Sequence, residues 1–482
     1  MSDDLKKTGT TMGKGILYLT VSRIIFATSG FLLHIGLARI LGVENYGIYG
    51  IIMAFLGITY VLYQPGVQTA VSKFTSEDAI RIKPILKAGL KLQAILSTVL
   101  IILVFITAPV IAILLKDSSL TSYIRLASLI ILPASLDTVY LASLNGVRFF
   151  GKQAISVIWH SVIKLLLSFL IILLGFKVKG VLISLIAATT ISMFISRYFC
   201  RFGDSDEKFE EKKLLFFAMP VLIYVFCVTS IPSIDILFVK SILQSNKDAG
   251  LYTSASNISK LPFVLFSSLA TVLFPSVSRA FSLNEMDLFK KYINQSLRYL
   301  ILFMFPIVAI FSATSGTVID IFYSNKYSGA ASSLSILIFG GAFSIILTTL
   351  ASVVIACSKQ KVVMYFALIL FPVDIILNKT LIPVYGLNGA AMATTITFFF
   401  GCVMLGLYIY YRFKALMGFY SFLKISSASV IIYVISKNFS IVGIAVIGEY
   451  IFLIILYFLL LFLSKEIKKE DVQTFKELLR FT

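Results

Sequence analysis

The chain has 482 residues, of which 59% are hydrophobic and 13% are charged. Soluble globular domains are about 45–50% apolar and about 25% charged, so this composition excludes an ordinary soluble protein. The chain carries 42 Lys and Arg residues against 23 Asp and Glu residues. In so apolar a chain, this basic excess is typical of cytoplasmic loops and indicates no nucleic-acid partner.

Apolar segments recur along the chain, each long enough for the roughly 20 residues that cross a bilayer as a helix. Fourteen windows meet this requirement, at residues 15–40, 47–71, 88–115, 120–144, 153–176, 180–200, 214–238, 249–275, 292–314, 329–356, 362–383, 387–411, 418–436 and 441–464. The sequence therefore predicts an all-α polytopic membrane protein with about 14 transmembrane helices.

Basic residues alternate from loop to loop along these windows. With a cytoplasmic N-terminus, 28 Lys and Arg residues fall on the two terminal segments and the even-numbered loops or at the span ends beside them, and 8 fall on or beside the odd-numbered loops. Because basic loops are retained in the cytoplasm, this pattern predicts a multi-pass protein of the cell membrane with both termini in the cytoplasm.

An internal repeat divides the chain. GIYG at Gly47 matches GLYT at Gly250, and three later pairs follow in the same order, with offsets that drift from 203 to 209 residues. Parallel six-span repeats are a transporter architecture. The repeat predicts two pseudo-symmetric six-helix lobes plus two C-terminal helices. The expected boundaries are 1–202 for the N-terminal lobe, 203–213 for a cytoplasmic inter-lobe loop, 214–411 for the C-terminal lobe, 412–464 for the two further helices and 465–482 for a cytoplasmic amphipathic tail.

Several segments at these landmarks resemble one family. They are ARILGVENYGIYG at 38–50, PGVQTAVSKF at 65–74, LNGVRFFGKQAI at 144–155, the long segment 235–279 and IPVYGLNGAAMATTITF at 382–398. They resemble the oligosaccharide-lipid flippases of the multidrug/oligosaccharidyl-lipid/polysaccharide exporter superfamily. The resemblance implies two lobes around a cationic cavity and a polyprenyl-diphosphate-linked oligosaccharide as the substrate. It also implies a role in cell-surface polysaccharide biosynthesis, alongside other polysaccharide-assembly proteins of the membrane.

Three basic residues lie near the middle of predicted spans: Arg23, Lys164 and Lys260. A charge at this depth costs roughly 2.5–3.5 kcal/mol on insertion scales, so it usually faces the protein interior and serves a function. We expect these three side chains to line a cavity that binds the diphosphate. An arginine guanidinium binds phosphate oxygens in a bidentate manner, whereas lysine acts as a point charge.

Other polar residues in the spans leave alternatives open. Four acidic residues, Asp137, Asp235, Asp374 and Glu449, offer partners for internal ion pairs with the three cations. Possible cavity or coupling residues are His34, His160, Asn257, Asp235 and Asp374. The two histidines share helix faces with Arg23 and Lys164, and the two aspartates offer oxygen ligands to a coupling ion, H⁺ or Na⁺.

Signals of enzyme chemistry are weak. The sequence contains no GxxxxGK[ST] phosphate-binding loop and no cluster typical of a metal site. We therefore predict a transporter that uses alternating access and no cofactor. One alternative is a cation-coupled multidrug exporter of the same superfamily, which would place carboxylates in its cavity. A second alternative is a membrane-embedded polysaccharide polymerase or glycosyltransferase, which would need an acid/base site or a large outer loop.

Overall fold

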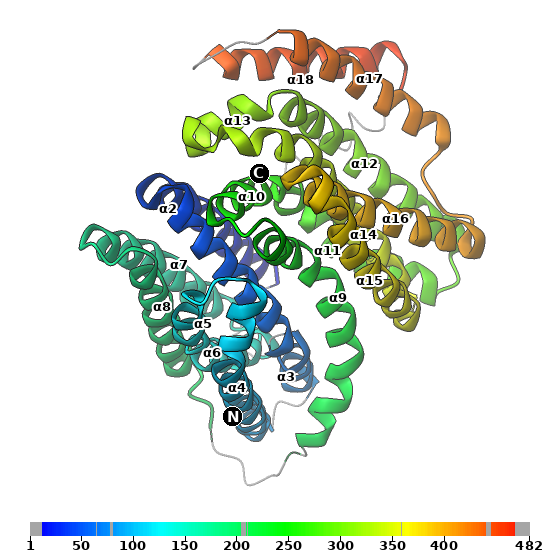
Figure 1. Cartoon of the computed structure of the whole chain (residues 1–482). Coiled ribbons are helices and arrows are strands. Elements are labelled where there is room, and N and C mark those ends of the chain that lie inside the picture. Colours follow the sequence, from blue (N-terminus) through cyan, green and yellow to red (C-terminus); the bar gives the residue numbers. More distant parts are fainter. Residues whose placement is uncertain are drawn as a thin grey trace. The chain divides into compact units, whose positions relative to one another are not determined.

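The computed structural model describes residues 12–63, 65–77, 81–203, 209, 211–357, 359–439 and 445–467. Within these ranges the regular structure is helical and contains no β-strand (Figure 1). A segment in lipid must satisfy its own backbone hydrogen bonds, which a helix does. The predicted all-α polytopic fold is confirmed. The amphipathic tail predicted beyond residue 467 and most of the inter-lobe loop lie outside the described residues.

In its described residues the first part of the chain forms seven helices, of which α2 contains the first predicted span and most of the second. Gly42 interrupts α2 with φ 75° and ψ 168°, a conformation that glycine adopts without steric cost. The helices are α2 (Met12–Tyr63), α3 (Pro65–Glu77), α4 (Ile82–Leu114), α5 (Leu120–Ser128), α6 (Ile131–Gly146), α7 (Phe150–Leu173) and α8 (Lys177–Phe199).

In the second part of the chain the eighth predicted span is divided. Lys260 separates α10 from α11, and Pro262, which has no backbone N–H to donate, stands in the first turn of α11. The elements are α9 (Glu211–Leu243), α10 (Asn246–Ser259), α11 (Leu261–Ser282), α12 (Met286–Ala313), α13 (Ser315–Tyr323), the 3-10 helix η1 (Asn325–Ala330), α14 (Ala331–Ala356), α15 (Gln360–Tyr385), α16 (Leu387–Phe413), α17 (Phe419–Asn438) and α18 (Ala445–Leu463).

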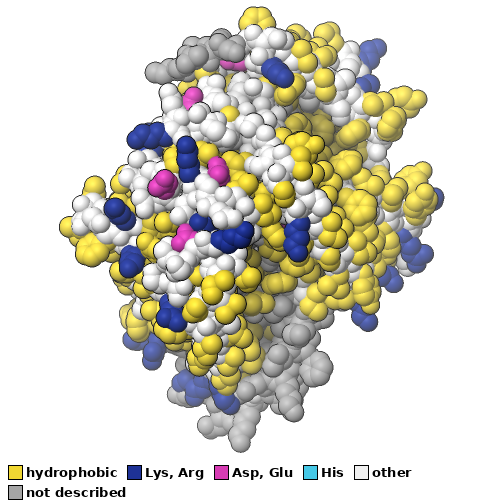
Figure 2. Space-filling model, viewed as in Figure 1, with side chains coloured by type: hydrophobic (Ala, Val, Ile, Leu, Met, Phe, Trp, Pro, Cys, Tyr) yellow, Lys and Arg dark blue, Asp and Glu magenta, His cyan; other side chains and the backbone are white. Residues whose placement is uncertain are grey.

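Twelve helical segments in the described residues are long and apolar enough to cross a membrane. The first of them, Leu17–Glu77, has 61 residues and covers two predicted spans, while α10 and α11 together cover the eighth. Large hydrophobic side chains remain exposed along most of these helices, and they cover much of the face drawn in Figure 2. Exposed apolar surface on this scale is what a lipid-facing surface requires.

The helices form two compact units. The first comprises Met1–Ser254 and Ala367–Ala390, and the second comprises Ala255–Phe366 and Ala391–Thr482. The first unit extends beyond the N-terminal repeat because α9 packs against α2 and α3. The predicted lobe boundaries were set by the sequence repeat. The two compact units are defined by packing, so they do not test those boundaries, which stay a prediction.

In the second unit a buried ion pair connects α12 to the chain just after α18. The Arg298 guanidinium donates to Glu466 Oε1 over 2.8 Å and to the Glu466 backbone carbonyl over 2.6 Å. Ser421, on α17, donates to the same carboxylate. The side chains of Arg298 and Glu466 are only 12% and 6% exposed. This pair therefore fastens the two C-terminal helices to α12.

We expect Arg298→Ala to destabilise the protein strongly. Removing one partner of a buried ion pair leaves the other charge uncompensated, which costs about 3–5 kcal/mol. Lys424→Ala is the matched control, because Lys424 lies 3.9 Å from the same carboxylate but is 39% exposed, and its loss should cost little. Thermal unfolding of the purified variants in detergent measures both effects. Equal stability of the two variants would contradict this role of Arg298.

Candidate functional site

Two of the three predicted cavity cations lie in the first compact unit, on α2 and α7. Arg23 is exposed on α2, and Phe26 follows about one helical turn later. The Lys164 ammonium lies over the Phe26 ring, 4.9 Å from its centroid, and His160 stacks against the same ring with centroids 6.4 Å apart. The fold thus brings Lys164 and His160 together around Phe26, on the helix that carries Arg23.

The third predicted cation, Lys260, lies in the second unit at the interruption between α10 and α11, where its side chain is exposed. The interruption is packed closely against α14, since a Cβ atom at Gly341 would overlap the Ser259 carbonyl oxygen. Asn257, on the preceding turn of α10, is partly buried. Gly341 therefore fixes the position of Lys260 beside α14.

Within the described part of the chain, Arg23, Lys164 and Lys260 form no ion pair with a carboxylate. The alternative in which the buried carboxylates pair with these three cations therefore has no support in the described residues. Lys164 is 9% exposed, and a ring face compensates an ammonium only in part, by roughly 0.5–2 kcal/mol. Basic side chains in such surroundings attract an anionic ligand.

His34 lies apart from the cations in an aromatic group on α2. Its Nδ1 atom is 3.1 Å from the Tyr46 hydroxyl, and the Tyr49 ring centroid is 5.6 Å from that of the imidazole. Both tyrosines are fully buried. His34 and Arg23 are predicted to share one helix face, but these contacts of the imidazole are with tyrosines and not with any of the three predicted cations.

The two candidate coupling aspartates meet in the first unit. Asp235 on α9 and Asp374 on α15 are both buried, and Asn378 connects them. The Asn378 amide donates to Asp235 Oδ1 over 2.8 Å and to Asp374 Oδ2 over 3.1 Å, while the Tyr252 hydroxyl donates to Asp235 Oδ2. The Asn378 Oδ1 atom has no hydrogen-bond partner among the described residues. The result is a cluster of buried oxygen atoms from three helices.

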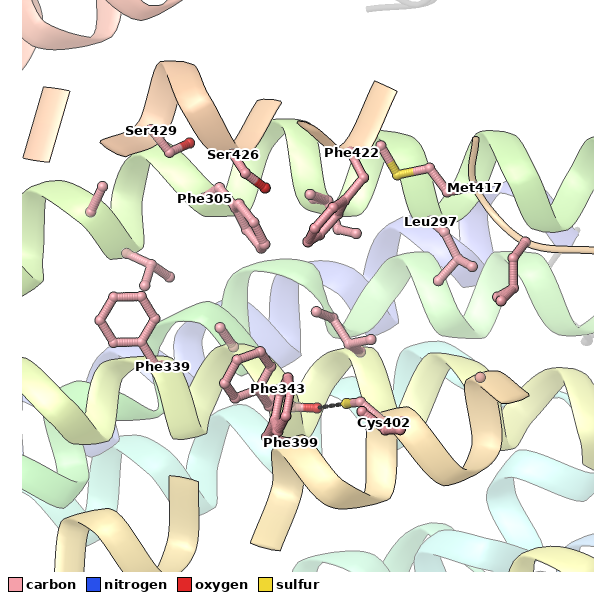
Figure 3. A pocket seen from close by; sticks show the side chains of 18 of the residues that line it. Leu297, Phe305, Phe339, Phe343, Phe399, Cys402, Met417, Phe422, Ser426 and Ser429 are labelled. Carbon is pink, nitrogen blue, oxygen red and sulfur yellow. Dashed lines mark hydrogen bonds between the residues drawn. The ribbon is translucent and has the colours of Figure 1, made fainter. Parts of the chain in front are cut away.

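An apolar cavity of about 940 Å³ lies in the second unit. Its walls are α12, α14, α16 and α17, and Phe305, Phe343, Phe399 and Phe422 project into it (Figure 3). The same helix α14 that borders this cavity with Phe343 contacts the Lys260 interruption through Gly341. The apolar cavity and a basic side chain therefore lie along one helix.

The two sequence repeats meet at equivalent positions within the first unit. A Cβ atom at Gly47 on α2 would overlap the Asn246 carbonyl oxygen, and a Cβ atom at Gly250 on α10 would overlap the Val43 carbonyl oxygen. Gly47 and Gly250 are 203 residues apart, and so are Val43 and Asn246. Equivalent residues thus make reciprocal contacts, as at a two-fold interface. The absence of side chains lets the two backbones approach closely.

A polar latch joins α9 to the loop between α4 and α5 in the same unit. The Lys240 ammonium, 2% exposed, lies 2.9 Å from Asp117 Oδ2, and Asn246 and Ser119 donate to the same carboxylate. Partial burial raises the pKa of the Asp117 carboxyl. The hydrogen bonds and the Lys240 charge outweigh burial, so the pKa lies below its ordinary value of 3.8.

The latch should make stability depend on pH in the acid range. A carboxyl whose pKa is lowered by folding contributes stability above its ordinary pKa, and the contribution is lost as the pH falls through the folded value. We expect thermal unfolding of the wild-type protein to show this acid loss and Asp117→Asn to be less stable at neutral pH with a flatter acid profile. Asp320→Asn, at an exposed carboxyl, is the control. If Asp117→Asn showed the same loss of thermal stability with falling pH as the wild type, this role of Asp117 would be contradicted.

Comparison with known proteins assigns the family. A model of the family described as "Polysaccharide biosynthesis protein" matches residues 36–332. The chain belongs to this family. The chain is also 22% identical to the lipid II flippase MurJ of Bacillus subtilis (strain 168) over an alignment of 456 residues, which covers 84% of this chain and 81% of the relative.

Solved structures have the same fold as this chain. The lipid II flippase MurJ in an inward closed conformation has a TM-score of 0.74 at 19% identity and covers 92% of this chain and 98% of its own. An inward-facing multidrug transporter of the MATE family, from the MOP superfamily, has a TM-score of 0.64 at 16% identity, with coverages of 82% and 98%. The family match confirms the expected family, and the solved structures show the same fold. These relatives are transporters, which also confirms a transporter and not an enzyme.

Sequence analysis missed two contributors to these sites. Asn378 follows Asp374 by four residues, so a helix places both on one face, and this spacing was a readable signal. The partner of Arg298 had no such signal, because Glu466 is 168 residues away.

Proposed function

We propose that this protein is a flippase that moves polyprenyl-diphosphate-linked oligosaccharide repeat units from the inner to the outer leaflet of the cytoplasmic membrane. The observation that carries the proposal is the set of mid-span cations, Arg23, Lys164 and Lys260, that pair with no carboxylate in the described residues. Two lie on the N-terminal repeat and one on the C-terminal repeat. A diphosphate is the ligand that such side chains bind best.

The substrate also has a long apolar tail. The aromatic cavity between α12, α14, α16 and α17 suits part of a polyprenyl chain, because its lining is almost entirely hydrophobic. Burial of each CH₂ group contributes about 0.8 kcal/mol relative to water. A chain already in lipid gains less, so we assign the cavity a guiding role and the cations the main binding energy.

Transport against a gradient needs an energy source, and Asp235, Asp374 and Asn378 are the residues we assign to it. Their buried oxygens suit a proton or Na⁺, and binding of a cation offsets the cost of holding two carboxylates together. The cluster joins α9 to α15, so its occupancy can stabilise one arrangement of these helices. Asp374→Asn should therefore abolish the dependence of transport on the ion gradient.

Alternating access requires a contact that opens and closes on one side. We assign this role to the reciprocal glycine contact of α2 and α10, placed on the outer side by the charge pattern of the loops. Gly50 lies directly against Thr253 in this contact. Thr253→Leu, which adds bulk against Gly50, should hold this contact open and reduce export, whereas Thr253→Ser, which removes a methyl group, should keep it. Normal export by a well-expressed Thr253→Leu variant would contradict the assignment.

The orientation of the protein follows from the same charge pattern. We propose that residues 203–213 and both termini are cytoplasmic and that the loop around Lys247 is external. A cysteine-reactive, membrane-impermeant label applied to intact cells should react with Lys247→Cys and not with Asp206→Cys. The reverse labelling would overturn the proposed orientation.

The experiment for the function is export in a strain that lacks its own flippase. Cells that express this protein should display the surface polysaccharide again, and cells that express Arg23→Ala should not, at equal protein levels. The second candidate is a cation-coupled multidrug exporter, favoured by the likeness to the MATE structure. That candidate predicts drug resistance without restored polysaccharide.

A further inference from the structure

A buried carboxyl in the first unit takes no part in the sites above. Asp137 on α6 is 7% exposed. The Ser192 hydroxyl on α8 donates to Asp137 Oδ2 over 2.9 Å. Ser196, one turn further along α8, lies beside the carboxyl. Neither Asp137 Oδ1 nor Ser196 Oγ has a partner in hydrogen-bonding geometry among the described residues.

No described residue supplies a positive charge to Asp137. Its neighbours on α6, Val139, Tyr140 and Ala142, belong to an apolar core. Cys200, at the end of α8, belongs to the same core, and its thiol donates to the Tyr140 backbone carbonyl. The helices packed against α6 are α2, α3, α4, α7 and α8. Their described charged and titratable side chains near this end are Lys73, Lys83, Lys87, Lys91, Lys152, Arg197 and Tyr140 of α6 itself, and none forms an ion pair or hydrogen bond with Asp137.

An ionised carboxylate in such a place is costly. Its desolvation penalty is several kcal/mol, and one serine hydroxyl offsets only part of it. A neutral carboxylic acid has one acceptor oxygen and one O–H donor. The acceptor oxygen, Asp137 Oδ2, accepts the hydrogen bond from Ser192. The O–H donor would lie on Asp137 Oδ1 and needs an acceptor, and the Ser196 hydroxyl oxygen beside it has no partner of its own among the described residues. The neutral form thus completes both hydrogen bonds with a small rotation of Ser196.

We propose that Asp137, Ser192 and Ser196 form a proton-binding site, in which Asp137 Oδ1 carries the proton and donates it to Ser196 Oγ. A metal cation fits less well, because one carboxylate and two hydroxyls offer fewer oxygens than the six to eight that hard cations such as Ca²⁺ take. Loss of the proton leaves a carboxylate that needs water, which the α6–α8 contact excludes. Proton binding therefore holds α6 against α8, and this inference is independent of the transported substrate.

The sign of the pH dependence follows from this arrangement. The closed α6–α8 contact binds one proton more than the state in which water reaches Asp137. Raising the pH therefore favours the open state, and lowering it favours the closed one. Asp137 makes no described hydrogen bond to Asp235, Asp374 or Asn378, so removing its proton should leave the hydrogen bonds of that group unchanged.

Infrared spectroscopy of the protein in lipid vesicles tests the proposal directly. A protonated carboxyl has a carbonyl stretch separate from the amide bands, so the neutral-pH spectrum of the wild type should contain one such band that Asp137→Asn lacks. Asp320→Asn, at an exposed carboxyl, should keep it. Ser192→Ala should shift the band to higher frequency, because the hydrogen bond to the carbonyl oxygen is lost.

Two results would overturn the proposal. The first is a neutral-pH spectrum in which the Asp137→Asn variant, or Ser192→Ala if Asp137→Asn does not fold, matches the wild type in this region. The second is a rise in thermal stability with Na⁺ that the wild type shows and Asp137→Asn does not, which would mark a cation site. Neither result would contradict the flippase proposal. Failure of polysaccharide export would in turn leave the infrared test of the proton site unaffected, so the two proposals can fail independently.

Discussion

Replacement of both Arg23 and Lys260 by alanine should abolish export of lipid-linked oligosaccharide while leaving the protein at its normal level in the membrane. A hydrogen bond to a charged group contributes about 1.5–3 kcal/mol, so loss of each cation should slow transport at least about tenfold. Polysaccharide display by a strain without its own flippase, measured beside the protein level, reports the effect.

Matched variants separate charge from fold. Arg23→Lys should keep part of the activity, because the charge remains and the bidentate geometry is lost. Lys326→Ala, at an exposed lysine between α13 and α14, should keep all of it. A well-expressed double variant with full export would show that neither cation is needed for transport. Loss of protein that Asp374→Asn rescues would mean that the cations serve internal ion pairs.

Gly47→Ala should have the second large effect. The added methyl group would overlap the Asn246 carbonyl oxygen, which belongs to a backbone and cannot swing away. Overpacking typically costs about 1–3 kcal/mol, and here it also forces α2 and α10 apart at the proposed outer closure. We expect export to fall at least about tenfold, and Gly250→Ala to behave alike because a Cβ atom there would overlap the Val43 carbonyl oxygen.

Gly30→Ala is the control for this prediction. It is the same substitution on the same helix, and no atom lies within 4 Å of the added carbon. Replacing a helical glycine by alanine usually stabilises a helix by up to about 1 kcal/mol, so this variant should export normally. Equal activity of Gly30→Ala and Gly47→Ala in cells would show that the close approach of α2 and α10 is dispensable.

Features that depend on local periodicity were predictable from the sequence. Window length and mean composition gave the spans, and the kink at Gly42 and the interruption before Pro262 fall where glycine and proline stand in apolar segments. The repeat pointed to Gly47 and Gly250 as equivalent positions. What it did not reveal was their direct contact, because sequence symmetry fixes equivalence and not distance.

Features that depend on distant residues were not predictable. Lys164 on α7 lies over the Phe26 ring on α2, and Asn378 donates to Asp235, which is 143 residues earlier in the chain. Helical spacing placed each of these side chains on a face but gave no information on the face opposite. For the same reason the carboxylates first considered as partners of the cations bind elsewhere: Asp235 and Asp374 bind Asn378, and Asp137 binds Ser192.

The most direct test of the central claim is transbilayer movement in vesicles that contain only the purified protein. A fluorescent polyprenyl-diphosphate-linked oligosaccharide is placed in one leaflet, and a membrane-impermeant quencher reports its appearance in the other. The account predicts rapid movement with the wild-type protein and movement at the rate of protein-free vesicles with the Arg23→Ala, Lys260→Ala variant. Wild-type vesicles that fail to move this lipid yet expel a cationic dye along a proton or Na⁺ gradient would contradict it.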